Sequence, residues 1–464
     1  MNNIKIYFIA LLPLLLLLAS IIFPQPVSAV LGVGIGSFYL GSSNKTEGSG
    51  RCDVMHFRPD GWQLWNTVTT LGPLETKGFG NIPELPLNHY NSQIVCTNGT
   101  TSIMGIWRNP TQTAIGAYGG DQGAINAAFI PGLVKNYYNQ TSSVFVSAEL
   151  WDLSLHISFY DINGTKVGST YFTTVPFLGM AEIDLKDYPS LPDGRYSVGI
   201  GTDGLDQLFT ATVVTRNVSG PDRVIAWRVD PLGGYKLYAP SVRKNYYGYN
   251  STLVINNWTD SAGYVTVSLL PGPYLVSSGN LAGHATLALN SSNFNIPDGD
   301  YTAVVTSSGA MVVGMSSTFH STNNSRGAYA LASPTFTSKY RALPALWNYT
   351  PNNDPRISSV KCMNTSQTQG KIRLTIQGGA YAESGDLGVN QGQEFVLQNI
   401  PQFPLHTMFA GLAESMSGGT IACVATSNVS GSSNDRFFQY ESNISNNDNN
   451  QNYSSKILTL YDDQ

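Results

Sequence analysis

Histidines, serines and carboxylates are the residue types from which catalytic and metal sites are built, and in this chain they are scattered. None of the six histidines lies within four residues of another, so no pair has the usual spacing of zinc ligands. A serine nucleophile is commonly presented on a Gly-x-Ser-x-Gly turn, and the sequence has no such motif. These patterns predict no catalytic residues, no metal and no cofactor, and therefore not an enzyme.

Two segments with closely placed aspartates, residues 161–164 and 298–300, resemble parts of calcium-binding loops. They lack the further oxygen ligands that a tight calcium site requires. The Asn-Gly and Pro-Asp-Gly sequences at these places are typical of turns. We therefore predict hairpin turns rather than metal sites.

Aromatic side chains are more informative, because the chain has 25 Tyr and 7 Trp residues. The candidate ligand-binding or interface aromatics are Tyr137, Tyr138, Tyr246, Tyr247, Trp62 and Trp65. Adjacent side chains on a strand point to opposite faces, so we expect one Tyr of each pair in the core and the other at the surface or against a neighbouring unit. Both roles can be structural. The functional alternative is a platform on which saccharides stack, with Trp62 and Trp65 near Tyr90 as a second patch of this type.

The four cysteines fall into two separate pairs. Cys52 and Cys96 lie in the first quarter of the chain, and Cys362 and Cys423 in the last. In an oxidising compartment this segregation predicts two local disulfides, Cys52–Cys96 and Cys362–Cys423. The chain has no Cys-x-x-Cys pair, so the cysteines do not indicate zinc.

The first 29 residues have the pattern of a secretory signal peptide. Lys5 precedes an apolar run over residues 6–23, and residues 27–29 are small enough for a signal peptidase site. We expect cleavage before Val30, with a retained membrane anchor as the alternative. No second apolar span follows, so we predict an extracellular or cell-surface protein with no transmembrane span in the mature chain. The net charge of -5 and the absence of Lys/Arg clusters predict no nucleic-acid partner.

Internal similarity divides the rest of the chain. Residues 129–138 recur as residues 238–247, with Pro, Lys, Asn, Tyr and Tyr matching at an offset of 109 residues, and residues 343–349 are a weaker third copy. A second landmark, residues 191–196, matches residues 296–301 around a Pro-Asp-Gly turn. A repeat of this length indicates an array of domains rather than a solenoid of short repeats.

The outer quarters of the chain also resemble each other. Residues 81–87 are similar to residues 399–405, and each quarter carries one pair of cysteines. We therefore expect the first and fourth units to be alike and to enclose two units without cysteine.

Strand patterns dominate inside the units. Alternating or β-branched segments predict strands at residues 144–148, 155–160, 264–269, 301–306 and 372–376. After the signal peptide, no stretch of a dozen residues has the apolar spacing of a helix. Short strands with turns every eight to twelve residues or so predict an all-β fold of about four tandem β-sandwich, immunoglobulin-like domains.

The predicted domain boundaries follow from these landmarks. They are a signal peptide (1–29), a β domain (30–118), two β-sandwich repeats (119–227 and 228–332), a second cysteine-containing β domain (333–435), and a linker with a terminal strand (436–464). Residues 442–455 are rich in Asn and Ser and are predicted to be disordered. Residues 456–461 look like a single strand, which can pair with its own chain or with another copy.

Fourteen Asn-x-Ser/Thr sequons occur in the chain. This number suits a glycoprotein with an exposed surface, although Asn, Ser and Thr also favour turns. The sequons alone leave glycosylation open.

The run Pro-x-Val-x-Lys-Asn-Tyr-Tyr-Gly at residues 240–248, followed by residues 253–257, resembles a repeat of secreted prokaryotic surface proteins. In that group, tandem β-sandwich modules begin with such a motif and end near a Pro-Asp-Gly turn. The resemblance covers the second and third units well and the outer units loosely. It implies location and architecture, and no activity.

These patterns together predict a non-catalytic extracellular or cell-surface protein with a structural or adhesive role. Its expected partners are copies of itself, in a surface assembly, or extracellular glycans. The alternative is a carbohydrate-binding protein that uses exposed Tyr and Trp faces, and the third interpretation is an enzyme with an unrecognised site. The first two differ in whether the aromatic side chains are exposed in a groove or buried between domains.

Overall fold

The structure is a computed structural model of the 464-residue chain. It describes residues 27–32, 37–43, 45, 50–80, 89–96, 101–108, 115–119, 125–149, 151–204, 206–219, 224–229, 233–321, 325–348, 356–429, 437–444 and 457–460. Among these residues the helices are short 3₁₀ turns, such as Leu185–Asp187. All five segments predicted as strands lie in strands, and the prediction of an all-β chain with several antiparallel sheets is confirmed.

One order of eight strands recurs along the chain, and we name its four copies units 1 to 4. The strands of unit 2 are β9 (Ala127–Lys135), β10 (Gln140–Ala148), β11 (Leu153–Tyr160), β12 (Lys166–Val175), β13 (Met180–Asp184), β14 (Gly194–Thr202), β15 (Phe209–Asn217) and β16 (Val224–Arg228). They form two antiparallel sheets, β12-β11-β14-β9 and β13-β10-β15-β16. Side chains from both sheets share one apolar core.

Unit 3 has the same order. Its strands are β17 (Lys236–Lys244), β18 (Tyr249–Asn257), β19 (Gly263–Leu270), β20 (Tyr274–Leu281), β21 (Thr286–Asn290), β22 (Gly299–Ser308), β23 (Val312–His320) and β24 (Arg326–Ala330). They pair as β20-β19-β22-β17 and β21-β18-β23-β24. Pro131 and Pro240 lie at the same position of the first strand in the two units, as the repeat predicted.

The outer units follow the same order with local changes. Unit 1 contains β1 (Val27–Gly32), β2 (Ser37–Ser42), β3 (Gly50–Phe57), β4 (Gln63–Leu71), β5 (Thr76–Gly80), β6 (His89–Cys96), β7 (Thr101–Arg108) and β8 (Ile115–Gly119), paired as β1-β6-β3-β4 and β5-β2-β7-β8. Unit 4 contains β25 (Tyr340–Asn348), β26 (Arg356–Asn364), β27 (Ile372–Ile376), β28 (Tyr381–Glu383), β29 (Gly392–Val396), β30 (Thr407–Ser415), β31 (Ile421–Val429) and β32 (Phe438–Glu441). Pairing of β25 with β26 joins its two sheets into one.

Apolar residues occupy every second position along strands such as β11, and this alternation gives the sheet one apolar face. Burial alternates over all eight residues of β11, with Leu155, Ile157 and Phe159 inaccessible to solvent. Their neighbours Ser154 and His156 point to the other face and are half-buried. The buried side chains of β11 therefore pack against the second sheet of unit 2 and form the core of this unit with it.

A proline at a β-bulge marks the first strand of three units. The pairing register shifts across Pro131, Pro240 and Pro344. Proline has no N–H to donate, so it suits a position where the ladder is interrupted. Three residues later a backbone N–H is bound instead by a serine hydroxyl of the next strand. The pairs are Val134 with Ser142 (3.0 Å), Arg243 with Ser251 (2.9 Å) and Trp347 with Ser358 (3.0 Å).

Both predicted disulfides are present. Cys52 and Cys96 lie directly opposite each other on β3 and β6, and Cys362 and Cys423 on β26 and β31, with Cα atoms 4.0 and 4.1 Å apart. The two bonds join different strands of the repeat, because β26 and β31 correspond to β2 and β7 of unit 1. Units 1 and 4 share the strand order, but the expectation that their cysteine pairs are equivalent is wrong. Structural disulfides persist in oxidising compartments, which supports a secreted or non-cytoplasmic location.

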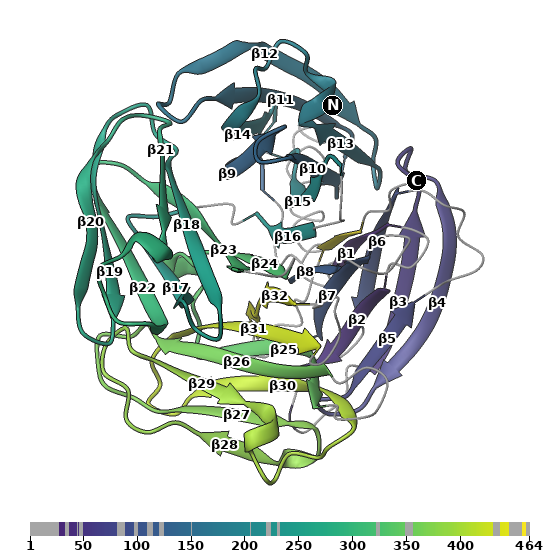
Figure 1. Ribbon diagram of the computed structural model, residues 1–464. Helices are drawn as coiled ribbons and strands as arrows, with labels where there is room; N and C mark the ends of the chain where they lie inside the picture. The colour runs from purple at the N-terminus through teal and green to yellow at the C-terminus, as the bar shows by residue number, and fades with distance from the viewer. Residues whose placement is uncertain are drawn as a thin grey trace, which may run out of the picture.

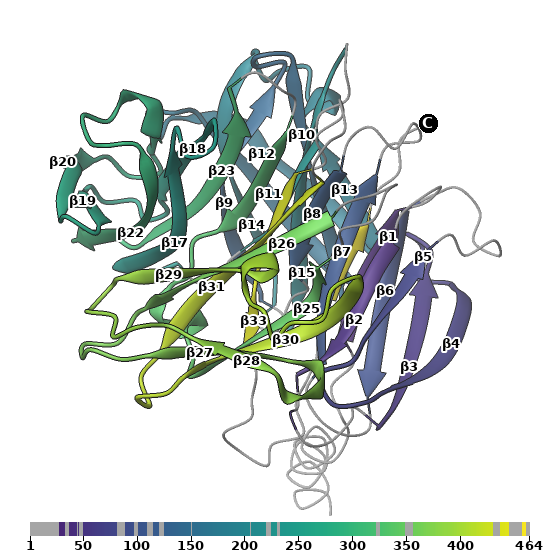
Figure 2. The same ribbon diagram turned by 60° about the horizontal axis from the view of Figure 1, so that its bottom comes forward.

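The four units close into a ring (Figure 1). Their last strands, β8, β16, β24 and β32, lie at its centre, and each contacts the next around the circle. The first strand of a unit packs on the second sheet of the following unit, so that β9 contacts β18 and β23, β17 contacts β26 and β31, and β25 contacts β2 and β7. Figure 2 shows units 1 and 3 on opposite sides of this centre.

The first and last described strands, β1 and β34 (Ile457–Leu460), both lie in unit 1. β34 pairs with β6, so the predicted terminal strand returns to its own chain. β1 spans the expected cleavage site before Val30, while residues 1–26 lie outside the described residues. Within the described ranges, no helix has the length and apolar character needed to cross a membrane.

The expected tail differs from the structure at its beginning. β32 lies inside the predicted linker of residues 436–464 but belongs to the sheet of unit 4. Ser442 is buried, and β33 (Asn443–Ile444) pairs with β25, so the disorder predicted for residues 442–455 does not begin at Ser442. Residues 445–455 lie outside the described residues, and the domain boundaries stay a prediction.

Candidate ligand-binding cleft

The Lys-Asn-Tyr-Tyr motif of unit 2 forms a tight turn. Tyr137 exchanges two backbone hydrogen bonds of 3.1 Å with Gln140 and encloses Tyr138 and Asn139. Both enclosed residues have positive φ, 49° and 61°, which is the pattern of a type I′ turn. Tyr138 is 82% exposed and Tyr137 is half-buried. The prediction that one Tyr of the pair enters the core is wrong, because the turn directs neither side chain into it.

Unit 3 repeats this turn with Tyr247 and Gly248 between Tyr246 and Tyr249. The Tyr246 hydroxyl donates a hydrogen bond of 3.0 Å to Glu394 of unit 4. Burial, together with Glu394, raises the pKa of Tyr246. Tyr247 is 78% exposed. The inner tyrosine of unit 3 therefore packs in the interface with unit 4, as the structural interpretation expected, and the outer one faces solvent.

The two sequence landmarks of a unit bind each other. Asn136 Nδ2 donates to Asp193 at 3.0 Å, and Asn245 Nδ2 donates to Asp298 at 2.7 Å. Hydrogen bonds from Asn245 and Lys244 lower the pKa of Asp298. The Pro-Asp-Gly turn thus holds the Lys-Asn-Tyr-Tyr turn in place, which explains why the two motifs recur together.

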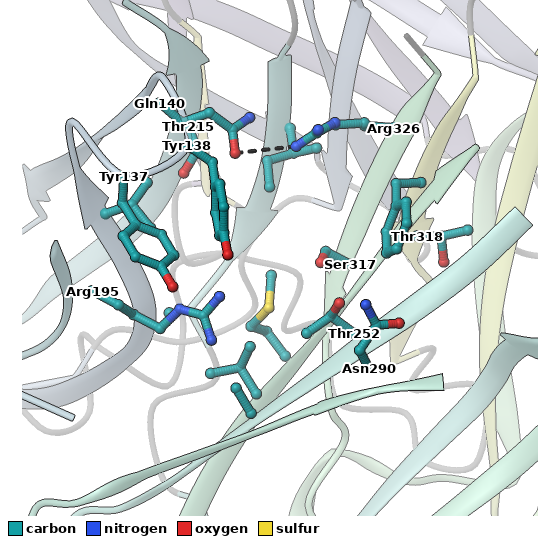
Figure 3. Close-up of a pocket in the computed structure, with 17 residues that line it drawn as sticks. Tyr137, Tyr138, Gln140, Arg195, Thr215, Thr252, Asn290, Ser317, Thr318 and Arg326 are labelled. Atoms are coloured by element: carbon teal, nitrogen blue, oxygen red, sulfur yellow. Dashed lines mark hydrogen bonds between the residues drawn. The ribbon is translucent and has the colours of Figure 1, made fainter. Parts of the chain in front are cut away.

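A cleft of about 720 Å³ opens between units 2 and 3, next to the Tyr138 turn (Figure 3). This volume is within the range of roughly 300–1,000 Å³ typical of small-molecule sites. The unit 2 wall contains Tyr137, Tyr138, Gln140 and Arg195, and the unit 3 wall contains Thr252, Asn290, Ser317 and Thr318. Apolar residues, among them Val134, Ile225, Val254 and Met315, complete the lining.

The charged side chains that line the cleft are two arginines, Arg195 and Arg326. The Arg195 guanidinium lies 5.5 Å from the centre of the Tyr137 ring, and Arg326 donates to Gln140 Oε1 at 3.1 Å. Interaction with the Tyr138 hydroxyl, and then partial burial, raise the pKa of Tyr137. Of the described residues that line the cleft, none is acidic. The cleft therefore has a positive charge, an aromatic rim and several hydroxyl and amide groups.

The tryptophan patch predicted from the sequence does not form as expected. Trp62 is 70% exposed, whereas Trp65 is half-buried and stacks on the buried His56 with ring centres 4.9 Å apart. The side chain of Tyr90 lies outside the described residues. Of the six aromatic candidates, the structure brings together Tyr137 and Tyr138 in the cleft, and it places the other four elsewhere.

Sequence reasoning missed the polar partners of these tyrosines. Arg195 follows the Pro-Asp-Gly turn of unit 2, and Asp300 stands at the same position in unit 3. This reversal of charge between two aligned repeats was a visible signal. No sequence signal marked the other cleft residues Asn290, Ser317 and Thr318. They are ordinary polar residues on strands, and they line a cleft only because the ring places unit 3 beside unit 2.

Buried asparagines show that not every sequon is open to glycosylation. Asn257 Nδ2 donates to three backbone carbonyls, and Asn364 Nδ2 does the same at the equivalent place of unit 4. Both side chains are almost fully buried, and a glycan on Nδ2 would replace these bonds. Asn139 and Asn163, in contrast, are exposed.

The described residues contain no group of three or more His, Cys, Asp or Glu side chains placed to hold a metal ion. The two aspartate-containing segments are engaged in turns, where Asp161 accepts backbone hydrogen bonds of 2.9 Å from Asn163 and Thr165. The described residues that line the cleft offer an aromatic ring for stacking and hydroxyl and amide groups for hydrogen bonds.

The comparisons with known proteins do not show a family for this chain. No family model and no curated protein matches the chain. A structure of Thermotoga maritima 1070 is 18% identical, covers 22% of this chain and 95% of its own, and has a TM-score of 0.19. The Bacteroides ovatus mixed-linkage glucan utilization locus protein SGBP-B, in complex with a mixed-linkage heptasaccharide, is 11% identical, covers 80% of this chain and 89% of its own, and has a TM-score of 0.14. These scores are too low to assign a fold or an activity.

Proposed function

We propose that this chain is a non-catalytic adhesive protein of the cell exterior that binds a saccharide in the cleft between units 2 and 3. The observation that carries the proposal is the cleft itself. It combines the exposed face of Tyr138 with hydroxyl and amide groups from a second unit. The proposal joins the adhesive role and the carbohydrate-binding alternative of the sequence analysis.

The arrangement suits a sugar because a pyranose ring has one apolar face and a rim of hydroxyls. The ring of Tyr138 offers an aromatic face, and Asn290 and Ser317 on the opposite wall offer hydrogen bonds. Most small-ligand sites have this combination of apolar lining and a few directed polar groups. The rigid type I′ turn keeps the aromatic ring in position, which lowers the entropy lost on binding.

We further propose that the four units are immunoglobulin-like β-sandwich domains of the secreted prokaryotic surface proteins that the Pro-x-Val-x-Lys-Asn-Tyr-Tyr-Gly motif resembles. The recurring strand order supports this assignment. An experimental structure in which the four units superpose on one another and on an immunoglobulin fold is the expected result. Units with unlike connections would contradict it.

A matched pair of variants tests the binding site. We expect Tyr138→Ala to weaken binding of an oligosaccharide by up to about tenfold, since an aromatic contact contributes roughly 0.5–1.5 kcal/mol. Tyr247→Ala removes the equivalent exposed residue of unit 3, which does not line the cleft, and should leave affinity unchanged. A glycan array identifies the oligosaccharide, and isothermal titration calorimetry measures both variants. Absence of any bound glycan, or equal losses in the two variants, would contradict the proposal.

A further inference from the structure

The interfaces between units 2 and 3 and between units 3 and 4 are built from equivalent strands. In both, the first strand of one unit packs on the second sheet of the next. The strand pairings establish which residues correspond. Val254 pairs with Ala288 in unit 3, and Lys361 pairs with Glu394 at the same positions in unit 4.

Charged side chains fill the interface between units 3 and 4. Asp300 lies 3.1 Å from Lys361 Nζ and 3.7 Å from Arg243 Nε, and Arg243 Nη2 lies 3.6 Å from Glu394. Asp300, Lys361 and Arg243 are nearly inaccessible to solvent. The four charges, two of each sign, neutralise one another, so burial leaves no charge without an opposite partner.

In the interface between units 2 and 3, apolar side chains occupy most of these positions. Val254 and Ala288 replace Lys361 and Glu394, and Val134 replaces Arg243. The small apolar side chains leave the space that forms the cleft. One charge remains at these positions, and its sign is reversed, because Arg195 stands where unit 3 has Asp300.

Arg195 has contacts of a different kind from those of Asp300. Its guanidinium lies over the Tyr137 ring and points into the cleft. Among the described residues, no carboxylate forms an ion pair with it. A half-buried guanidinium beside an apolar floor interacts strongly with an anion that replaces the missing carboxylate. Its planar donor pair matches the two oxygens of a carboxylate group.

We propose that Arg195 makes the cleft selective for saccharides that carry a carboxylate, such as oligomers of uronic acids. This inference rests on the proposed function, and it adds the chemical class of the sugar. The aromatic face of Tyr138 would hold the ring of the sugar, and Arg195 its charge. Arg195 is thus the specificity-determining residue, and removing it should affect charged ligands alone.

The test compares a uronic-acid oligosaccharide with the neutral oligosaccharide of the same linkage. We expect the wild-type protein to bind the acidic ligand about 10- to 100-fold more tightly, as for a hydrogen bond to a charged group. Arg195→Gln should abolish this difference and change the affinity for the neutral ligand less than about twofold. Arg195→Asp, which introduces the residue of unit 3, should bind the acidic ligand more weakly than the neutral one.

The outcomes separate this inference from the function on which it rests. If neither oligosaccharide binds, the saccharide site itself is wrong. If both bind equally well, or if Arg195→Gln retains the preference, the site stands and the role of Arg195 is overturned. A sulfated oligosaccharide that binds more tightly than the uronic acid would also overturn the carboxylate assignment. Tyr138→Ala should weaken binding of both ligands by the same factor.

Discussion

At the scale of single residues, His56 is a titratable side chain that the fold removes from water. It is fully buried on β3, stacks on Trp65, and has Nδ1 2.5 Å from Ser92 Oγ. Burial lowers the pKa of His56 to about 3, so the imidazole is neutral in the folded protein at any pH near neutrality. In the unfolded chain the histidine has a pKa of about 6.5. As the pH falls, His56 is therefore protonated in the unfolded chain at a higher pH than in the folded one.

This difference predicts a pH dependence of stability. Because the folded pKa is lowered, the contribution of His56 is present above about pH 6.5 and is lost as the pH falls toward 3, by up to about 1.4 kcal/mol per pH unit. His56→Phe keeps an aromatic ring against Trp65 and cannot be protonated. We expect the unfolding midpoints of wild type and variant, measured by calorimetry from pH 7 to pH 4, to converge or cross on acidification. Parallel curves would contradict the assignment.

At the scale of elements, the bulged first strand depends on a serine in the second. Ser251 Oγ accepts the Arg243 N–H that the bulge around Pro240 leaves without a ladder partner. Ser251→Ala should destabilise the protein by about 1–3 kcal/mol, because it leaves a buried N–H unsatisfied. Ser278→Ala on the exposed side of β20 is the matched control, with an expected change below about 0.5 kcal/mol. Denaturant unfolding measures both, and equal effects would show that the bond does not stabilise the bulge.

The same elements show how far the sequence predicts this structure. The alternation of apolar and polar residues along strands such as β11 predicted an all-β chain. The recurrence of Pro, Lys, Asn and Tyr predicted repeated units, and the separation of the cysteines into two pairs predicted both disulfides. The position of Tyr137 and Tyr138 was mispredicted because the strand pattern continues through the motif, and only positive φ at Tyr138 and Asn139 reveals the turn. A tyrosine in such a conformation has no sequence signature of its own.

The cleft could not be predicted for a related reason. Its two walls come from units that the sequence shows only as separate repeats. Whether their interface is filled or open depends on pairs such as Val254 with Ala288, compared with Lys361 and Glu394. These differences acquire meaning only when the repeats are aligned strand by strand and placed side by side.

At the scale of the whole molecule, closure of the ring depends on unit 1. β34 and β1 both pair with β6 over the same residues, Tyr90 to Gln93, while β3 occupies the other edge of β6. One edge holds one strand. Cleavage before Val30 would remove half of β1, and β34 can then take its place. β34 contacts β15 of unit 2, just as β9 contacts β23 of unit 3 and β25 contacts β7 of unit 1. After such cleavage the C-terminal strand would supply the first strand of unit 1 and complete the ring.

This arrangement predicts the effect of removing the tail from the mature chain. Deleting residues 455–464 should lower the thermal midpoint by several degrees and expose the edge of β6, and an exposed edge promotes pairing between chains. Light scattering should therefore show a monomer for residues 30–464 at all concentrations and a concentration-dependent mass for the deletion. Leu458→Pro should act in the same direction, since proline cannot donate to a ladder, and removal of residues 462–464, beyond β34, should have no effect. If instead the mature chain assembles and the deletion makes it monomeric, β34 pairs with a second copy and a surface assembly replaces the closed ring.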